Sequence, residues 1–424
     1  VSSRTNSNYI DKTTFNNNFS LTVPSLGFMY GKDIYDFGVK REEGLVSYGF
    51  FFGYNRTDNY NRNFSFSGLN NSSSILDSYA ESAFGINEND LGAGNSPASL
   101  AYNTYLISPT ASGSTVYEAE IPANQAANQS GIIQRKGRMH EWNLAGGLNF
   151  SNRVYIGLSA NLHSFQFENN SDYRESYTQT NYGGSGSMRH QAEFRPNGTA
   201  VSAKFGVLFR LFDEWRAGIA FHTPKTFSIS EFYEDRMTSQ GFFGAQQNWS
   251  SDPGTFDYRI NTPSRVVFSN AFIIDKVLSI TTDIDRINYK NGSIISEFDF
   301  SDVNRDAQEI FRTAHNIKIG VEFNYFDMRF RGGYSFYGSP YNEDRFKSGI
   351  NHNINIGHAG IGYHPKKNGE TFFIDLGIQI ASYSDLYTPY FLSTNSTRSY
   401  FTATNKTRFT QFIISLGFNI EWLV

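Results

Sequence analysis

Apolar and polar residues alternate strictly at the end of the chain. From Phe412 to Trp422 each second position is apolar, and the positions between are mostly small or polar. This two-residue period is that of a β-strand with one apolar face and one polar face. A final strand with aromatic residues on its apolar face is what a transmembrane β-barrel needs to close on itself. The last strand of a soluble β-sandwich would show the same period.

The same period recurs along the chain, in segments that are often joined by two to five residues. The predicted strands are 19–30, 45–54, 140–150, 154–162, 201–211, 215–221, 265–274, 277–289, 317–325, 328–336, 354–363, 372–380 and 408–422. Barrels of this kind prefer an even number of strands, and residues 1–9 supply part of a further one. Alternate connections run to dozens of residues, which is typical of short periplasmic turns opposite long extracellular loops. The sequence therefore predicts one all-β domain over 1–424, a transmembrane antiparallel β-barrel of about 14 strands.

Composition agrees with such a barrel. Aromatic residues make up 17% of the chain, yet hydrophobic residues reach only 39% and the mean hydropathy is −0.44. This combination is expected when apolar side chains face lipid and polar ones fill the lumen. The chain has no run of apolar residues long enough for a membrane helix, no cysteine, and a net charge of −4 without a basic block, so a nucleic-acid partner is not expected.

The longest predicted extracellular loop, residues 55–134, contains helical patterns. Ser72 to Ser74 precede one helix, Ser96 and Pro97 begin a second, and a third is predicted in another loop over residues 302–314. Apolar helices at a barrel mouth either pack the loop or offer a landing site for a hydrophobic ligand. Under the second interpretation the ligand-binding residues of the loop are Ile75, Leu76, Tyr79, Phe84, Leu100 and Tyr102.

Inward-facing positions of the predicted strands carry charges of both signs. Lys204, His222 and Lys318 fall near mid-height of the lumen, where a cation is suited to the head group of an acidic amphiphile. The alternative is a salt-bridged lumen network, which is also the favoured interpretation of Asp283 and Asp285 on one strand face. No catalytic constellation, metal-binding pattern or cofactor motif is present, so we expect a protein that is not an enzyme, with no cofactor and no metal.

Two early strands carry signs of a weakened wall. Pro24 coincides with a change in the parity of the apolar positions, and the inward face of the next strand is small at Ser47, Gly49 and Gly53. Proline removes a ladder donor and glycine fills no space, so a kink or lateral gap is predicted between these strands. Alternatively, the glycines accommodate a large aromatic side chain or a plug inside the lumen.

Residues 261–289 and 317–344 resemble the late strands of the FadL family of outer-membrane transporters for long-chain fatty acids and other hydrophobic compounds. The matching residues are Thr262, Pro263, Asp283, Gly320, Glu322, Phe323, Arg331, Gly333, Tyr334, Ser339 and Pro340. The resemblance implies a fourteen-stranded barrel in the outer membrane of a Gram-negative bacterium, with capture of the ligand by extracellular loops and passive, lateral release through the wall.

The resemblance also implies an N-terminal hatch with an Asn-Pro-Ala motif, which this chain does not show. Because residues 1–18 carry no secretion signal either, we expect a processed chain with about fifty further residues upstream, by analogy with that family. The implied partners are outer-membrane lipids and a small hydrophobic ligand. Relatives with this barrel also serve as subunits of secretion or assembly machines, so an accessory barrel with outer-membrane protein partners is the alternative function.

Overall fold

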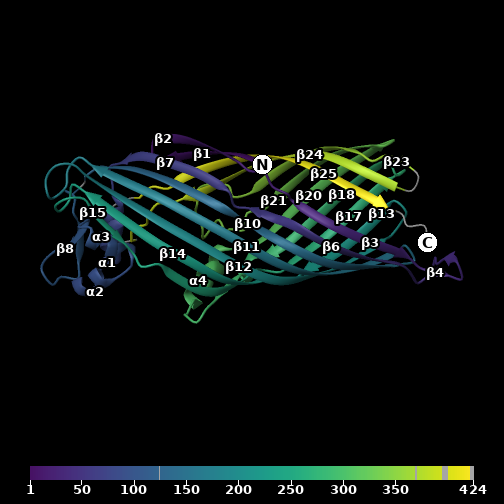
Figure 1. Ribbon diagram of the computed structural model, residues 1–424, viewed down its shortest axis with the longest axis horizontal. Coiled ribbons are helices and arrows are strands. Elements are labelled where there is room, and N and C mark those ends of the chain that lie inside the picture. Colours follow the sequence, from purple (N-terminus) through teal and green to yellow (C-terminus); the bar gives the residue numbers. More distant parts are fainter. Residues whose placement is uncertain (124, 368–369, 394–399, 421–424) are drawn as a thin grey trace.

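Antiparallel strands form one large, elongated barrel-shaped sheet in the computed structural model, which describes residues 1–123, 125–367, 370–393 and 400–420 (Figure 1). The strands of this sheet are β1 (Ser2–Tyr9), β2 (Lys12–Phe19), β3 (Ser25–Asp33), β6 (Leu45–Asn59), β7 (Arg62–Asn70), β10 (Ala127–Phe150), β11 (Val154–Tyr177), β12 (Gly186–Arg210), β13 (Trp215–His222), β14 (Thr226–Gln240), β15 (Gln247–Ser250), β16 (Gly254–Asn261), β17 (Arg265–Ile274), β18 (Leu278–Asn288), β19 (Ser293–Ile295), β20 (Thr313–Tyr325), β21 (Met328–Tyr337), β22 (Ile354–Tyr363), β23 (Lys366–Lys367), β24 (Glu370–Tyr387) and β25 (Ala403–Ile420). The predicted all-β antiparallel fold is confirmed.

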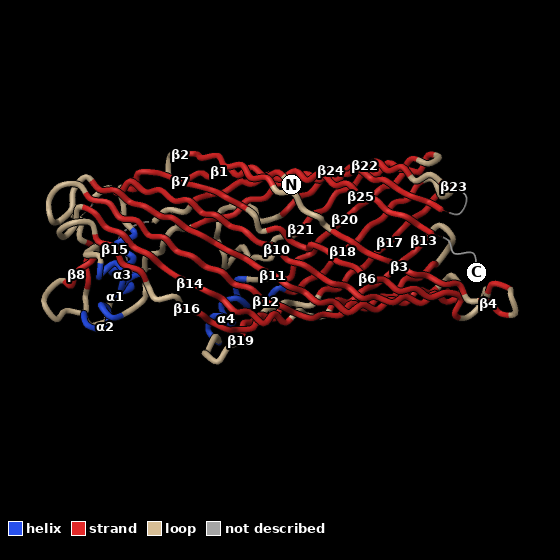
Figure 2. Tube along the Cα trace, viewed as in Figure 1, coloured by secondary structure: helices blue, strands red, loops and turns tan. Residues whose placement is uncertain are grey.

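Short elements decorate both ends of this wall. They are β4 (Tyr35–Asp36), β5 (Val39–Lys40), β8 (Ile107–Pro109), β9 (Tyr117–Ala119), the helices α1 (Ile75–Ala83), α2 (Glu88–Ala93), α3 (Pro97–Asn103) and α4 (Ser301–Ile310), and a 3₁₀ turn, η1 (Tyr289–Asn291). Figure 2 shows α1, α2 and α3 at one end of the wall and α4 on its flank. None of the described helices is long and apolar enough to cross a membrane.

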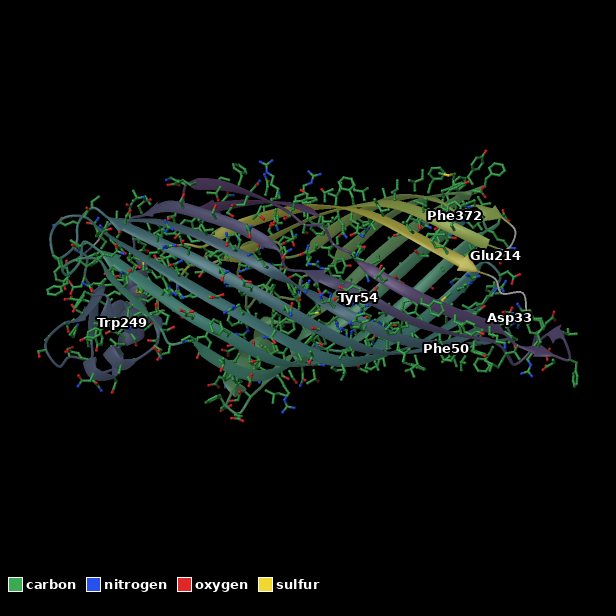
Figure 3. All side chains as sticks on the ribbon, viewed as in Figure 1. Asp33, Phe50, Tyr54, Glu214, Trp249 and Phe372 are labelled. Carbon is green, nitrogen blue, oxygen red and sulfur yellow. The ribbon has the colours of Figure 1, made fainter. Side chains whose placement is uncertain are left out.

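The two halves of the wall have opposite hydropathy. In the half that ends in short turns, side chains on the outer face are apolar and exposed, as with Trp142, Leu144 and Val201, and Phe50, Tyr54 and Phe372 lie in this half (Figure 3). In the half that ends in long loops, the apolar side chains point inward and are buried, as with Phe66. A membrane strand needs only about 9–11 residues, whereas β10, β11 and β12 have 24, 24 and 25. The wall therefore crosses a membrane with its first half, here called the membrane belt, and extends beyond it with the second.

A line of strand breaks separates the membrane belt from the extension. The sheet is interrupted between β2 and β3, between β13 and β14 and between β16 and β17, and each gap contains a proline: Pro24, Pro224 and Pro263. Pro196 lies further out in β12, where the β11–β12 pairing is also interrupted. Because proline has no N–H to donate to a ladder, these positions end or bend strands.

The first and last strands of the sheet pair with each other. β1 pairs with β25, from Ser2↔Thr410 to Asn8↔Thr404, and with β2 on its other side. β2 in turn contacts β7 through a hydrogen bond from the Asn16 amide to the Ser65 hydroxyl at 3.1 Å. Among the described residues, β3 pairs only with β6, and the last part of β25 only with β24. Val1 lies beside this part of the wall (Figure 1).

The predicted loop at 55–134 is too long. β6 continues to Asn59, β7 follows, and β10 already begins at Ala127, which leaves residues 71–126 as the loop. The helix predictions are confirmed, with Ser74 and Ser96 as N-caps of α1 and α3 and Pro97 at the start of α3. Trp422 and part of the predicted turn at 365–369 lie outside the described residues.

Candidate functional site

The first loop folds inward and plugs the extracellular end of the barrel. Its core joins residues of α1 and α3 to inward side chains of the wall, including Tyr9, Phe66 and Met237. Ile75, Leu76, Tyr79 and Leu100 belong to this core and are between 0% and 6% exposed. Their predicted role as an open landing site is therefore wrong for this arrangement, because the helical spacing serves the packing of the plug.

The other two predicted loop residues remain accessible. Phe84 is 69% exposed at the end of α1, and Tyr102 is partly exposed on α3, where its hydroxyl lies 3.4 Å from Glu88. These two side chains stay proposed ligand contacts.

A buried carboxylate anchors the plug to the wall. Glu175 of β11 accepts hydrogen bonds from the backbone N–H of Ile75 at 2.9 Å, from the Tyr173 hydroxyl at 2.6 Å and from the Gln129 amide at 2.7 Å, and it also contacts the hydroxyls of Ser74 and Tyr177. Ser74 is the N-cap of α1, so the carboxylate sits at the positive end of that helix. The first turn of α1 is therefore held by a wall strand.

Burial changes the titration of this network, which lies outside the membrane belt. Desolvation raises the pKa of Glu175 above its ordinary value, although the hydrogen bonds from Ser74, Tyr173, Tyr177 and Ile75 oppose that rise. Burial and the neighbouring carboxylate raise the pKa of Tyr173 and Tyr177 well above 10. Both phenols therefore stay protonated and able to donate.

The inner wall of the membrane belt carries the predicted network of charges. Lys204 pairs with Glu141 at 2.8 Å and Lys318 with Asp285 at 3.0 Å. His222 of β13 is the register partner of Lys204 on the neighbouring strand β12. Carboxylates thus neutralise both lysines. This arrangement is the salt-bridged lumen network, the alternative to a site for an acidic head group. Asp283 likewise has a partner, the Ser269 hydroxyl at 2.5 Å.

A pocket of about 360 Å³ lies on the inner wall between β18 and β25. Its floor consists of small residues on neighbouring strands, because Gly320 faces Gly333 and Gly360 faces Gly377 across the ladders, with Ile413 beside Gly377. Four glycines without side chains leave this hollow on the inner face of the wall. We call it the lumen pocket.

Polar groups surround the floor of the lumen pocket. Arg331 bridges Glu322 at 2.6 Å and Asp375 at 2.7 Å, and the His358 ring lies 3.0 Å from the Ser335 hydroxyl. Lys318 also lines the pocket, whereas Lys204 and His222 do not. An apolar floor with a few fixed polar groups at its edge is the usual composition of a small-molecule site. Within the described residues, no group of histidine and acidic side chains is arranged to hold a metal.

The predicted gap between the two early strands is wrong. The ladder between β3 and β6 is continuous from Ser25↔Asn55 to Asp33↔Ser47, and Gly49 faces Gly31 within it. The glycines make room for an aromatic side chain, since a Cβ at Gly53 would lie 2.4 Å from the Phe51 ring and one at Gly27 would lie 2.8 Å from it. Ser47 bonds to the Asn149 amide at 3.0 Å and belongs to an ordinary wall contact.

Pro24 does mark an interruption, in a different place. β2 ends at Phe19 and β3 begins at Ser25, so residues 20–24 belong to no strand. Leu21 is 90% exposed and Val23 59% exposed within this segment. The interruption therefore separates the successive strands β2 and β3. It does not open the ladder between two paired strands.

An exposed aromatic cluster at the extracellular end was not predicted from the sequence. Tyr105, Tyr182 and Phe243 come from three different loops and are 41%, 43% and 54% exposed. The Phe243 ring lies 4.8 Å from that of Tyr105 and 5.8 Å from that of Tyr182, centroid to centroid. No local pattern could reveal it, because its three residues lie in separate loops that only the fold brings together.

Taken together, the membrane belt, the short turns, the long plugged loops and the polar lumen define an outer-membrane β-barrel. No protein-family model matches the chain, and no curated protein matches it. Solved structures similar to it include the toluene transporters TbuX of Ralstonia pickettii (12% identity, 98% of this chain and 86% of that one, TM-score 0.42) and TodX of P. putida (11%, 98% and 86%, 0.44). A FadL homologue of Pseudomonas aeruginosa is also similar (10% identity, 98% and 89%, TM-score 0.46).

These solved structures are of toluene transporters and a FadL homologue. The FadL family is the one that residues 261–289 and 317–344 resemble. Because the identities are near 10% and the TM-scores are below 0.5, the function proposed below rests on the residues of this chain.

Proposed function

We propose that the protein is a passive outer-membrane channel for hydrophobic compounds, and that the lumen pocket binds them on their way through. The observation that carries this proposal is a glycine-floored hollow inside the membrane belt, in a lumen that also carries the ion pairs Lys204–Glu141 and Lys318–Asp285. Binding at such a floor is driven mainly by the burial of apolar surface. Transport is downhill, because nothing in the chain suggests a coupled energy source.

Capture begins at the extracellular end. The cluster of Tyr105, Tyr182 and Phe243 offers apolar ring surface outside the membrane, and Phe84 and Tyr102 add accessible rings on the plug. The ligand then has to pass the plug, whose residues are packed in the arrangement described here. Movement of the plug is accordingly part of the proposed transport cycle.

The ligand class that fits best is a long-chain fatty acid or a similar amphiphile. Its apolar part would occupy the floor near Gly360, Gly377 and Ile413, and Lys318 and Arg331 at the edge would meet a carboxylate. Both cations are already paired, so a bound carboxylate would share them with Asp285 and Asp375.

Release is proposed to be lateral, through the interrupted segment at residues 20–24. This segment has exposed apolar side chains and belongs to no strand, and its backbone bonds to the wall at its two ends, through Ser20 to Val1 and Pro24 to Arg56, at the level where the membrane belt ends. A ligand leaving there would enter the lipid without crossing a polar phase.

The lumen pocket is tested by filling it. A Cβ at Gly377 would have only ordinary contacts at 3.8 Å or more, so Gly377→Leu is compatible with the wall and places a side chain in the pocket. Uptake of labelled oleate by cells that lack another fatty-acid channel should fall about tenfold, equivalent to roughly 1.4 kcal/mol. Gly357→Leu is the matched control, because Gly357 is exposed on the same sheet and has nothing within 4 Å. Equal uptake by wild type and Gly377→Leu would refute the pocket.

The release site is tested by a reversible staple. The Asn59 amide lies 3.2 Å from the Ser20 hydroxyl across the interruption, so cysteines are placed at these two positions, and the chain has no cysteine of its own. We expect oxidation to block uptake and reduction to restore it. A control staple at Asn16 and Ser65 joins β2 to β7 in the extension and should have no effect. Uptake that continues through the oxidised Ser20–Asn59 staple would place release elsewhere.

A further inference from the structure

The outer face of the extension carries two polar hollows outside the membrane belt. The upper one, of about 690 Å³, is lined by outward side chains of β10, β11, β12 and β14, together with Trp249 of β15. The lower one, of about 510 Å³, is lined by β12, β14, β16 and the loop after β19. We call them the upper and lower outer-wall grooves.

Arginines fixed by shared carboxylates line the upper groove. Arg174 and Arg189 both bind Asp172, at 2.9 and 2.8 Å between nitrogen and carboxylate oxygen, so two cations share one anion. The hydrogen bonds from Arg189 and Arg174 outweigh desolvation and lower the pKa of Asp172 to about 2. Arg236 is held by Glu234 at 2.8 Å. The groove therefore has a surplus of positive charge on ordered guanidinium groups whose remaining N–H donors face outward.

Amides, hydroxyls and one indole complete the lining of the upper groove. Asn128, Gln191 and Asn248 contribute amides, and Trp249 is 47% exposed at the loop end of the wall (Figure 3). The lower groove shares the amide and hydroxyl groups with Asn197 and Thr199, but Asp257 and Glu297 outnumber its one cation, Arg259, so only the upper groove carries surplus positive charge. The upper groove forms hydrogen bonds with sugar hydroxyls and ion pairs with phosphates or sugar acids, while the exposed indole offers a stacking face.

The height of the grooves identifies what they face. Along β12 the outer face changes from Val201, which is 68% exposed in the membrane belt, to Thr199 and Asn197 of the lower groove and then to Arg189 of the upper one. At about 2.3 Å of height per residue of a strand tilted near 45°, the lower groove begins within roughly 10 Å of Val201 and the upper one lies roughly 28 Å above it. In a Gram-negative outer membrane, the phosphorylated sugars of lipopolysaccharide stand at these heights.

We propose that the upper outer-wall groove binds the saccharide part of lipopolysaccharide molecules that surround the barrel. This groove lies beyond the membrane belt, and its surplus positive charge complements an anionic glycan. Binding anchors the long extension upright and orders the glycan beside it. This role is independent of transport through the lumen.

Binding of lipopolysaccharide to the purified, detergent-solubilised protein tests the proposal. The probes are lipopolysaccharide with a complete core, lipopolysaccharide with a truncated core, lipid A, free core oligosaccharide and a soluble capsular polysaccharide. We expect complete-core lipopolysaccharide to bind most tightly, and the double variant Arg189→Ser, Arg236→Ser to weaken that binding about tenfold while leaving lipid A unchanged. Arg305→Ser is the matched control, since this arginine is 66% exposed on α4, away from both grooves.

Each other outcome overturns the proposal. Equal affinity for lipid A and complete-core lipopolysaccharide would assign binding to the membrane belt, and tighter binding of a soluble capsular polysaccharide would assign a different glycan. An unchanged double variant would remove the arginines from any site. Heat-modifiable migration on electrophoresis checks that the variant barrel is folded. Should that variant fail to fold, Gln191→Ala with Asn248→Ala removes two amides from the same groove and is judged by the same criteria.

Discussion

Replacing Glu175 by alanine should loosen the plug without unfolding the barrel. The side chain is 1% exposed as part of β11, and its carboxylate is the acceptor that holds the first turn of α1. Alanine removes that acceptor and leaves a cavity between the wall and the plug. The strand itself keeps its backbone ladders with β10 and β12, because these do not involve the side chain.

The size of the effect follows from the donors that lose their acceptor. The Tyr173, Tyr177 and Ser74 hydroxyls can rotate toward other partners, and the Gln129 amide keeps the Tyr390 hydroxyl at 2.9 Å. The Ile75 N–H loses the Glu175 carboxylate as its acceptor and stays buried, which costs about 1–3 kcal/mol. The cavity left by the side chain adds to this cost. We therefore expect the plug to open more easily by about 2–4 kcal/mol, or some 30-fold to 900-fold in the opening equilibrium.

Hydrogen exchange of the amides of α1, measured by mass spectrometry, checks this expectation. Exchange in α1 should accelerate in Glu175→Ala, while the amides of β11 in the membrane belt should remain protected. Glu175→Gln is the graded control, because it keeps one oxygen for the Ile75 N–H and should have a smaller effect. Unchanged exchange of α1 in Glu175→Ala would refute the view that this carboxylate anchors the plug.

Three further predictions concern charge and packing. The pKa of Glu175 is raised in the docked plug, so the docked state binds the proton more tightly. Docking should therefore be strongest below about pH 4.5 and weaken as the pH rises through the raised pKa. Hydrogen exchange of the α1 amides, corrected for intrinsic rates, checks this, and in Glu175→Gln it should not vary with pH in this way. Gly53→Ala should lower the stability to urea by about 1–3 kcal/mol because its Cβ would strike the Phe51 ring, and Phe51→Leu in the same chain should restore part of the loss; no rescue would mean that the strain lies elsewhere. Asp285→Asn should free Lys318 and tighten oleate binding several-fold in a detergent binding assay, and weaker binding would show that the ion pair only supports the wall.

The membrane belt was predictable because its information is local. Side chains of a strand alternate between two faces, so residues such as Trp142 and Leu144 reveal the lipid-facing side without any knowledge of their neighbours. The same logic missed β7, although Phe64 and Phe66 alternate with serines there. In that strand the apolar face points inward and the polar face outward, which is the reverse of a membrane strand.

The sites were less predictable because they depend on register and packing. Helical spacing in α1 identified its apolar face but not whether plug or ligand would cover it, and Leu76 proved to be fully buried. The lumen pocket requires Gly320 to face Gly333 and Gly360 to face Gly377 across separate ladders. Such a coincidence is fixed by hairpin register, and no segment of the sequence carries it alone.

Tyr390 gives the plug a role in the timing of assembly. Its hydroxyl bonds the amides of Asn70 and Gln129 and the hydroxyl of Ser73, groups that precede it by as many as 320 positions. Contacts of such long range form late, because the intervening chain must first be arranged. The plug and the first strands precede Tyr390 in the chain, so the hydrogen bonds of its hydroxyl to the plug can form only after the last hairpin has folded. During insertion into the membrane, the plug would thus lack the hydrogen bonds to Tyr390 until the wall is nearly complete. Their formation would mark complete folding of the barrel.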